Sequence, residues 1–382
     1  MHWTALREEG RFPQWNHEHW PWYVIYLPVL PVLLWHAIRA RSLVFFTNVD
    51  PAIDMSGFFG ERKSEIYALL PNDSYPTTLC IEPGTSWAEV EHQVDAARLQ
   101  FPLIVKPDIG ERGEGVIRVP SIEILQHAIE HANEAVLVQD LIPGECEFGM
   151  MFVHDPETDA VELLSITGKQ FLTVIGDGVG SVEVLLQRTF RGSRQVERLL
   201  AYKADLLKVV PALGEHVVVE PIGNHCRGTT FVDASALRTP PLERRIAALV
   251  RSTGGVYYGR FDVRADSVEA FQEGRFSIVE MNGVSSEPGH VYDPAMNIFQ
   301  CWSELLRHTR HIPKISHQLR RQGHPPVSLR MFLERCDAHF DPPPFWRWLL
   351  HVIAKSRTVQ VPTALRRPAG TSFEADPVQS VR

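Results

Sequence analysis

The sequence lacks the cysteine patterns of disulfide-rich and zinc-binding proteins. Its 382 residues include only five cysteines, an odd number, and no two of them are separated by just two residues. Disulfide frameworks use paired cysteines, and structural zinc sites use closely spaced thiols. We therefore expect free thiols, a reducing compartment and a cytoplasmic protein, and we expect no zinc site.

An excess of positive charge is also missing. The chain has 38 lysines and arginines against 46 acidic residues, which gives a net charge of −8. A general nucleic-acid binder presents a basic face, so we expect no nucleic-acid partner. Hydrophobic residues make up 44% of the chain, which is enough for a large core. The length favours two or three domains or subdomains.

No apolar run is both long and unbroken. Residues 20–38 are long enough to span a bilayer, but three prolines interrupt them. A proline inside a helix costs about 3 kcal/mol. We expect a short extended segment and then a buried helix over 32–40, with Pro31 in its first turn. Peripheral membrane contact through residues 20–41 is the alternative, and no transmembrane span is expected.

Strand and helix patterns alternate along most of the chain, but several strands follow one another directly. This arrangement indicates antiparallel pairing and an α+β (mixed α/β) fold. We expect strands at 43–47, 78–81, 103–106, 116–119, 136–140, 148–153, 161–167, 217–220, 229–232, 257–264 and 276–281. We expect helices at 61–75, 86–99, 121–132, 241–253, 300–309 and 345–355.

The most informative motif lies on the last two expected strands. Asp262 stands on one of them, and Glu280 and Asn282 stand two residues apart on the other. Two carboxylates and an amide are oxygen ligands that suit Mg²⁺. Arg260 shares a strand face with Asp262, because side chains two apart point the same way. A metal, a phosphate and a guanidinium on one surface suggest phosphoryl transfer from a nucleotide.

A second motif places a lysine before a glycine-rich loop. Lys106 ends an expected strand, and the loop 110–115 follows it, with Gly110, Glu111, Arg112 and Gly113 as candidate phosphate contacts. Glycines let a backbone approach phosphate oxygens and donate N–H groups to them. The loop is not a Walker loop, because no Gly-Lys-Ser/Thr follows. A plain hairpin turn with an exposed lysine is the alternative.

A third motif runs from a strand into a Pro-Gly turn. Such a crossing can present backbone groups to an adenine edge, and a carboxylate after it can bind ribose hydroxyls. A strand followed by a surface turn is the alternative. The candidate residues are Gln139, Asp140, Leu141 and Ile142 for adenine, and either Glu145 or Glu147 for ribose.

Together these motifs, in this order over about residues 61–295, resemble the ATP-grasp family. They are similar to D-alanine–D-alanine ligases and to the ligase half of cyanophycin synthetase. The resemblance implies two α+β subdomains that clasp ATP. It assigns phosphate contacts to Lys63 and Lys106, and it matches Arg260, Asp262, Glu280 and Asn282 to the metal and catalytic strands.

Two further segments strengthen the resemblance. Lys169 matches a family lysine that reaches the transferred phosphate, and the Gly-Asp-Gly at 176–178 leads into a helix, as in cyanophycin synthetase. His225 and Arg227 fall where this subgroup lines the acceptor pocket, although a surface loop is the alternative. Gln139 departs from the usual hinge glutamate. The N-terminal region has no obvious glycine-rich turn, which argues against D-alanine as the substrate.

The resemblance implies ATP and two Mg²⁺ ions as cofactors, with Mn²⁺ as a substitute and Glu280 bridging the two ions. Catalysis would fall to Arg260 and Lys169. A carboxylate would be activated as an acyl phosphate, and the loop 110–115 would close as a lid. Substrate would lie just past Asn282, although a structural turn there is the alternative. The candidate substrate residues there are Ser285, Ser286, Glu287, His290 and Tyr292.

The expected regions are an N-terminal extra domain at 1–60, a small subdomain at 61–138, a large subdomain at 139–312 and a helical C-terminal extension at 313–382. The leading hypothesis is an ATP-dependent carboxylate–amine ligase acting on an amino acid or small peptide. An ATP-grasp kinase, a carboxylate–thiol ligase and a non-catalytic nucleotide-binding regulator are the alternatives. A homodimer is left open.

Overall fold

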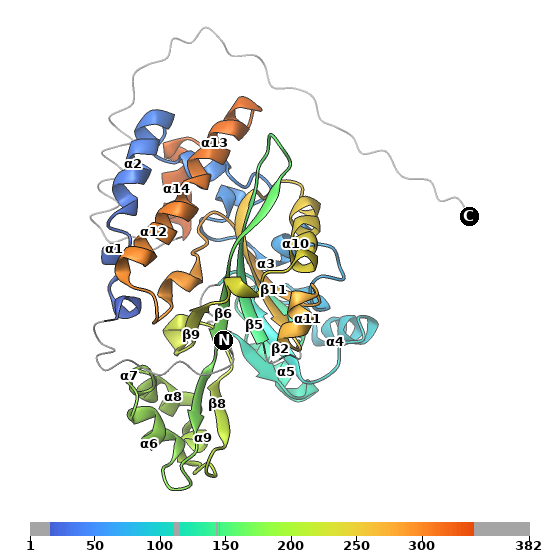
Figure 1. Ribbon diagram of the computed structural model, residues 1–382. Coiled ribbons are helices and arrows are strands. Elements are labelled where there is room, and N and C mark those ends of the chain that lie inside the picture. Colours follow the sequence, from blue (N-terminus) through green and yellow to red (C-terminus); the bar gives the residue numbers. More distant parts are fainter. Residues whose placement is uncertain (1–15, 111–114, 143, 145, 340–382) are drawn as a thin grey trace. The chain divides into compact units, whose positions relative to one another are not determined.

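The structure is a computed structural model that describes residues 16–110, 115–142, 144 and 146–339. Figure 1 shows these residues as coloured ribbons. The chain divides into two compact units, one ending at Phe332 and the other beginning at Leu333. The sheets described below lie in the first unit. Described residues of the second unit belong to helix α14 (Leu329–His339), whose first residues lie in the first unit.

The smaller sheet has four antiparallel strands in the order β1-β4-β2-β3. Two helices pack on it, because Val90, Val94 and Leu125 are buried against Leu103 and Val105 of the central strand. The strands are β1 (Thr78–Ile81), β2 (Leu103–Pro107), β3 (Ile117–Val119) and β4 (Val136–Asp140), and the two helices are α4 (Trp87–Ala96) and α5 (Ile122–Glu130). Helix α3 (Lys63–Ala68) precedes β1, and its buried residues belong to the core of the larger sheet.

The larger sheet has five antiparallel strands in the order β11-β10-β5-β6-β9. Its inner strand β5 is buried over eight successive residues, because both sides of the sheet are covered. Phe148 and Phe152 pack toward α10 and α11, while Met151 packs toward α13. The elements are β5 (Cys146–His154), β6 (Val161–Gln170), β9 (Thr230–Asp233), η6 (Ser235–Leu237), α10 (Pro240–Ser252), β10 (Tyr258–Ala265), α11 (Val268–Gln272) and β11 (Ser277–Asn282).

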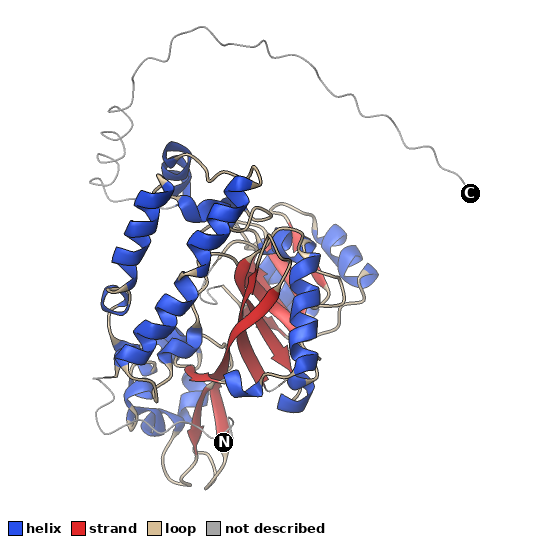
Figure 2. Cartoon of the chain, turned by 45° about the horizontal axis from the view of Figure 1, so that its top comes forward, coloured by secondary structure: helices blue, strands red, loops and turns tan. Residues whose placement is uncertain are grey.

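A helical layer covers the face of the larger sheet opposite α10 (Figure 2). It combines residues from both ends of the first unit, since Ile25 and Val29 share a core with Cys301 and Leu305. The elements are η2 (His17–His19), α1 (Trp22–Ile25), α2 (Val29–Ala40), η3 (Phe45–Asn48), η4 (Asp54–Ser56), η7 (Gly289–Tyr292), α12 (Ile298–Thr309) and α13 (His311–Arg321).

Two expectations for the N-terminal region are wrong. The strand expected at 43–47 is the short helix η3, because its apolar residues are buried beside α13 rather than paired in a sheet. Short apolar runs do not by themselves distinguish the two states. The segment before 32–40 is already helical, and α2 is buried on one face only. Pro31 does lie in the first turn of α2. No helix in the described ranges is long and apolar enough to cross a membrane.

A third part projects from the larger sheet as the antiparallel pair of β7 (Leu172–Ile175) and β8 (His216–Glu220). Four short helices pack on it around a core of its own, which includes Val174, Leu186 and Val219. The helices are α6 (Val182–Gln187), α7 (Phe190–Ser193), α8 (Val196–Tyr202) and α9 (Ala204–Lys208), and the turn η5 (His225–Arg227) follows β8.

The sheets and helices make the fold α+β, as expected, and the C-terminal region is helical through α13 and α14. The expected boundary between residues 138 and 139 falls inside β4. Residues 16–60 pack within the first compact unit together with the two sheets. The helix expected at 345–355 lies outside the described residues.

Candidate active site

The two expected metal-binding strands lie side by side. Strands β10 and β11 are antiparallel neighbours, and their register sets Asp262 opposite Glu280 and Arg260 opposite Asn282. Paired residues on one face of a sheet have side chains within reach of each other. The pairing therefore brings together four residues that the motif had placed on two separate strands.

A bulge next to this pair links the two sheets. The register passes from Asp262–Glu280 to Val263–Ile278, so Val279 has no partner on β10. Its carbonyl oxygen instead accepts hydrogen bonds from the Tyr67 hydroxyl at 2.5 Å and from Lys106 Nζ at 3.3 Å. A bulge leaves the extra residue unpaired in the strand ladder, so its backbone groups can form hydrogen bonds elsewhere. Lys106 of the smaller sheet is thereby held beside Glu280 of the larger one.

Five charged side chains form an alternating chain along β10, β5 and β6. Both Asp262 oxygens accept hydrogen bonds from Arg260, each at 2.9 Å, and Lys169 Nζ lies 3.3 Å from Asp262 Oδ1. Lys169 also donates to Glu147 at 2.9 Å, and Glu147 accepts from Arg264 at 3.0 Å. Gly223 covers Glu147 so closely that a Cβ there would lie 2.1 Å from its Oε1.

Burial and charge act against each other in this chain. Burial by itself would raise the pKa of Asp262, but Arg260 and Lys169 outweigh it and lower the pKa below its usual range. Burial would likewise lower the pKa of Lys169, but Asp262 and Glu147 raise it. Both groups are therefore charged at neutral pH, and the low-polarity surroundings strengthen their attraction.

Glu280 differs from the other carboxylates of the site. No hydrogen bond or ion pair to it is found within the described part of the chain, yet it acts electrostatically on Lys63, Lys106 and Arg260. Burial lowers the pKa of Lys106 to about 8, even though Glu280 acts in the opposite direction. A partly exposed carboxylate among three cations can accept a metal or a phosphate-bound cation without first breaking an ion pair.

The residues present fit a magnesium ion. Asp262, Glu280 and Asn282 supply oxygen atoms at neighbouring positions of two paired strands. The amide nitrogen of Asn282 is buried and makes no hydrogen bond to a described residue. No hydrogen bond through this nitrogen to a described residue therefore fixes the orientation of the amide. Hard oxygen ligands of this kind are what Mg²⁺ prefers.

Lys63 begins α3 and lies against the start of the glycine-rich loop. Its Nζ donates to the carbonyl oxygen of Gly110 at 2.7 Å. Asp108 fixes this arrangement, since its carboxylate accepts from the backbone N–H of Ser64 at 2.8 Å and from Arg62 at 2.6 Å. A carboxylate at a helix N-terminus stabilises the helix. Glu111, Arg112 and Gly113 lie outside the described residues.

The expected adenine hinge follows the end of β4. Gln139 is buried, and its amide donates to Thr78 at 2.6 Å. The backbone N–H of Asp140 donates to the Thr77 carbonyl at 3.1 Å, and Leu141 and Ile142 are half-buried. Of the two ribose candidates, Glu145 lies outside the described residues, and Glu147 belongs to the charged chain.

The candidate substrate wall joins residues from both ends of the first unit. Glu287 accepts hydrogen bonds from Tyr26 at 2.5 Å and from Tyr292 at 3.4 Å, and its backbone carbonyl accepts from Arg260 at 3.1 Å. The His225 ring lies 5.4 Å from that of Tyr292. The structure thus brings His225, Glu287 and Tyr292 together beside Arg260.

The other substrate candidates have different partners. Ser285 and Ser286 donate to backbone carbonyls, at 2.7 Å to Gly57 and at 2.6 Å to Gly283, as in a structural turn. Arg227 lies 3.8 Å from Glu220, a buried carboxylate of β8.

His290 lies in a separate buried cluster with Glu304 and His308. Their ligand atoms lie within 4.8 Å of one another, a spacing that a metal ion could use. However, Arg307 donates to the same Glu304 oxygen at 2.6 Å, and a guanidinium there repels a cation.

Several residues of this wall carry no sequence motif. Tyr26 and Glu18 come from the N-terminal segment, and Glu18 pairs with Arg191 and lies 3.3 Å from His225. Their partners are more than 170 residues away. The only signal in the sequence is the density of aromatic residues in that segment, which does not distinguish a site from a core.

No family model matches the sequence, and no curated protein matches it. Solved structures match part of the chain. The D-alanine–D-alanine ligase of Bacillus anthracis matches with a TM-score of 0.41 and 16% identity, over 71% of this chain and 72% of that one. The D-Ala:D-Ser ligase VanG of Enterococcus faecalis matches with a TM-score of 0.38 and 15% identity, over 67% and 64%.

A bifunctional glutathione synthetase from Pasteurella multocida matches with a TM-score of 0.39 and 16% identity, over 66% of this chain but only 36% of that chain. All three identities are below 25% and all three TM-scores are below 0.5.

Proposed function

We propose that this protein is an ATP-dependent carboxylate–amine ligase that forms an amide bond on an amino acid or small peptide. The observation that carries the proposal is the group of Asp262, Glu280 and Arg260 on paired strands, with Lys106 held beside it by the Val279 bulge. Two carboxylates, an arginine and buried lysines on one surface match the needs of phosphoryl transfer to an anionic substrate.

In this proposal Asp262, Glu280 and Asn282 hold Mg²⁺, which when bound offsets the charge of the ATP phosphates. Lys63 and Lys106 bind phosphate oxygens from the smaller sheet. Arg260 and Lys169 both form ion pairs with Asp262, and they would stabilise charge on the transferring group. The 139–142 segment would bind adenine, and Glu147 or Glu145 the ribose.

The reaction has two steps. An oxygen of the donor carboxylate attacks the terminal phosphorus of ATP, and the bond to ADP breaks, which gives an acyl phosphate. The nitrogen of an amine then attacks the acyl carbon, the bond to phosphate breaks, and the amine loses a proton. Glu287 would orient the amine, a role supported by its hydrogen bonds from Tyr26 and Tyr292 and by its position beside Arg260.

The test is a screen for ADP release over amino acids and dipeptides, with mass spectrometry of the products. We expect ADP release that depends on both substrates and a product lighter than their sum by one water. ADP formed at full rate without an amine would favour a kinase instead. Formation of a thioester with a thiol acceptor would favour a carboxylate–thiol ligase.

An Arg260→Ala variant should lose about a hundredfold to a thousandfold in turnover, because a charge-stabilising donor in a closed site is removed. Its fold should persist, since Lys169 still neutralises Asp262. Arg244→Ala, at an exposed position on α10, is the matched control and should behave as the wild type. Binding of Mg-ATP without turnover on any substrate would point to a regulatory nucleotide-binding protein.

A further inference from the structure

Helices α1 and α2 expose an apolar stripe. On α2, Ile38 lies three and four positions after Trp35 and Leu34, so these three share a face away from the buried Val29 and Ala37. Trp22 and Ile38 are 68% and 63% exposed. Soluble proteins rarely leave such a contiguous patch without a use. Its large residues are Trp22, Tyr23, Leu27, Leu30, Leu34, Trp35, Ile38 and Leu43.

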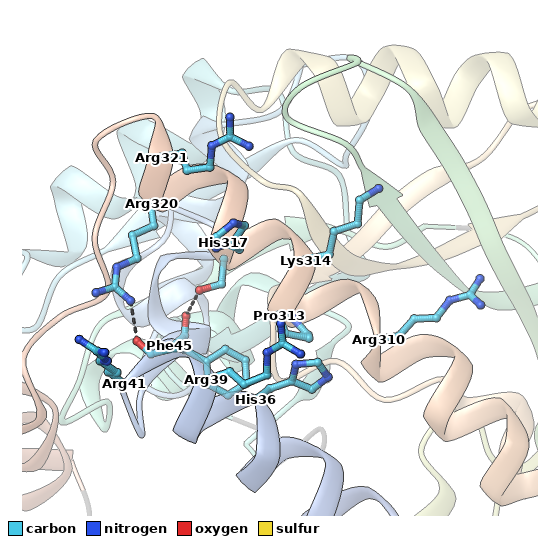
Figure 3. Close-up of a pocket in the computed structure, with 12 residues that line it drawn as sticks. His36, Arg39, Arg41, Phe45, Arg310, Pro313, Lys314, His317, Arg320 and Arg321 are labelled. Atoms are coloured by element: carbon cyan, nitrogen blue, oxygen red, sulfur yellow. Dashed lines mark hydrogen bonds between the residues drawn. The ribbon is translucent and has the colours of Figure 1, made fainter.

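A strongly basic hollow adjoins the end of this stripe. It has a volume of about 710 Å³ and lies between the C-terminal end of α2 and α13. Figure 3 shows His36 and Arg39 from α2 and His317 and Lys314 from α13 around it. Its lining has no acidic residue. Six lysines and arginines line it: Arg39, Arg41, Arg310, Lys314, Arg320 and Arg321.

Much of this charge is not offset. Lys314 pairs with Asp155 at 2.7 Å, and Arg321 lies 3.5 Å from Glu157. For Arg39, Arg41 and Arg310, no carboxylate lies within 4.0 Å among residues 16–110, 115–142 and 146–339. The cluster stands out because the whole chain carries a net charge of −8.

Arg39 connects the two features. Its guanidinium lies over the Trp35 ring, 5.7 Å from the ring centre, so one turn of α2 joins the apolar stripe to the basic hollow. Apolar residues with tryptophan and tyrosine, bordered by lysine and arginine, are the combination found at membrane interfaces. The apolar side chains enter the boundary of the acyl chains while the cations meet anionic headgroups.

We propose that this surface, α1, α2 and the basic hollow beside α13, docks the protein peripherally on an anionic lipid bilayer. A second copy of the chain is a poorer occupant. A symmetric dimer with its two-fold axis near the hollow would bring two cationic clusters together. A bilayer with anionic headgroups satisfies both the apolar stripe and the charge.

The test is flotation of the full-length protein with vesicles of phosphatidylcholine alone, or with about a third phosphatidylglycerol. We expect binding to the anionic vesicles only, and its loss between about 0.05 and 0.5 M NaCl. Inorganic phosphate should displace the protein no better than NaCl at equal ionic strength. Specific phosphate binding with no vesicle binding would overturn the proposal.

Variants on each feature sharpen the test. Arg39→Gln and Arg310→Gln should each weaken partitioning about fivefold, the factor for one cation at an anionic surface. Trp22→Ser with Ile38→Ser should weaken it at least as much. The matched controls are Arg244→Gln on α10 and Leu213→Ser, which is 83% exposed on the β7–β8 part. Equal losses in the controls would contradict the proposed surface.

Two further measurements separate the rival occupants. Hydrogen exchange with vesicles present should show protection over 22–43 and 310–321, and protection confined to other segments would overturn the proposal.

Light scattering of the wild type and of the Trp22→Ser, Ile38→Ser variant should give the same mass in solution. A wild-type dimer that the variant loses would assign the face to a second copy. This proposal does not depend on the ligase chemistry.

Discussion

Asp262 and Glu280 are directly opposite each other on β10 and β11, yet in the described residues only Asp262 forms ion pairs. Asp262 is held by Arg260 and Lys169, whereas Glu280 has no hydrogen-bonded partner in the described residues. Two carboxylates on the same pair of strands therefore have different surroundings. Asp262 already pairs with two cations, whereas Glu280 forms no such pair with a described residue.

This difference predicts unequal effects of the two substitutions on stability. Glu280→Gln should change the free energy of unfolding by no more than about 0.5 kcal/mol, because no ion pair is lost. Asp262→Asn should cost about 3–5 kcal/mol, because Arg260 and Lys169 lose a buried partner. Urea unfolding measures both. ADP formation should be abolished by Glu280→Gln, while the surface control Glu243→Gln should retain it. Equal destabilisation by both site variants would contradict the assignment.

Lys106 predicts a loss of activity at alkaline pH. Burial lowers the pKa of its amine to about 8, so above that pH the group loses the charge with which, in the proposed function, it would bind phosphate. We expect kcat/KM for ATP to fall by up to about tenfold per pH unit above pH 8. Lys106→Arg should remove this fall, since arginine stays charged. The exposed Lys208→Arg is the control, and a flat wild-type profile to pH 9 would refute the prediction.

Asp50 predicts a pH-dependent stability. Its carboxyl group is fully buried where the backbone N–H groups of Tyr257 and Tyr258 donate to it, and burial raises its pKa to about 8. The folded state thus keeps a proton that the unfolded chain loses near pH 4. Stability should fall as pH rises from about 4 to 8, by at most about 1.4 kcal/mol per pH unit.

An Asp50→Asn variant should lose this dependence, because the amide is neutral at every pH. Denaturant unfolding at several pH values measures the slope. Asp205→Asn, whose side chain is fully exposed, should keep the wild-type slope. A slope that persists in Asp50→Asn would assign the dependence to another group.

Gly223 predicts a steric requirement above the charged chain. A Cβ at this position would lie 2.1 Å from Glu147 Oε1 and 2.9 Å from Lys169 Cδ. Gly223→Ala should therefore displace the Glu147–Lys169 pair, lower stability by about 1–3 kcal/mol and reduce turnover. Gly180→Ala is the control, since its nearest contacts, the exposed Arg188 and Asp177 Oδ1, both lie 3.3 Å away. Unchanged stability and activity in Gly223→Ala would show that the pair tolerates displacement.

Much of the local structure followed from the sequence. The strand expected at 136–140 is β4 over the same residues, and those expected at 257–264 and 276–281 are β10 and β11 to within one residue. The alternation of apolar and polar residues and the turn residues that predict these strands involve only neighbours a few positions away in the chain. The strand expected at 43–47 failed because its apolar side chains found partners on α13, far along the chain.

The sequence by itself determined which chemical groups the site contains and their order on successive strands. The tertiary structure decided how they meet. It placed the bulge at Val279 that holds Lys106, joined Glu147 to Asp262 through Lys169, and brought Tyr26 to Glu287 across 261 positions. Residue spacing controls which side chains share a helix or strand face. Contacts between distant segments are set by the packing of the whole chain, which no local pattern encodes.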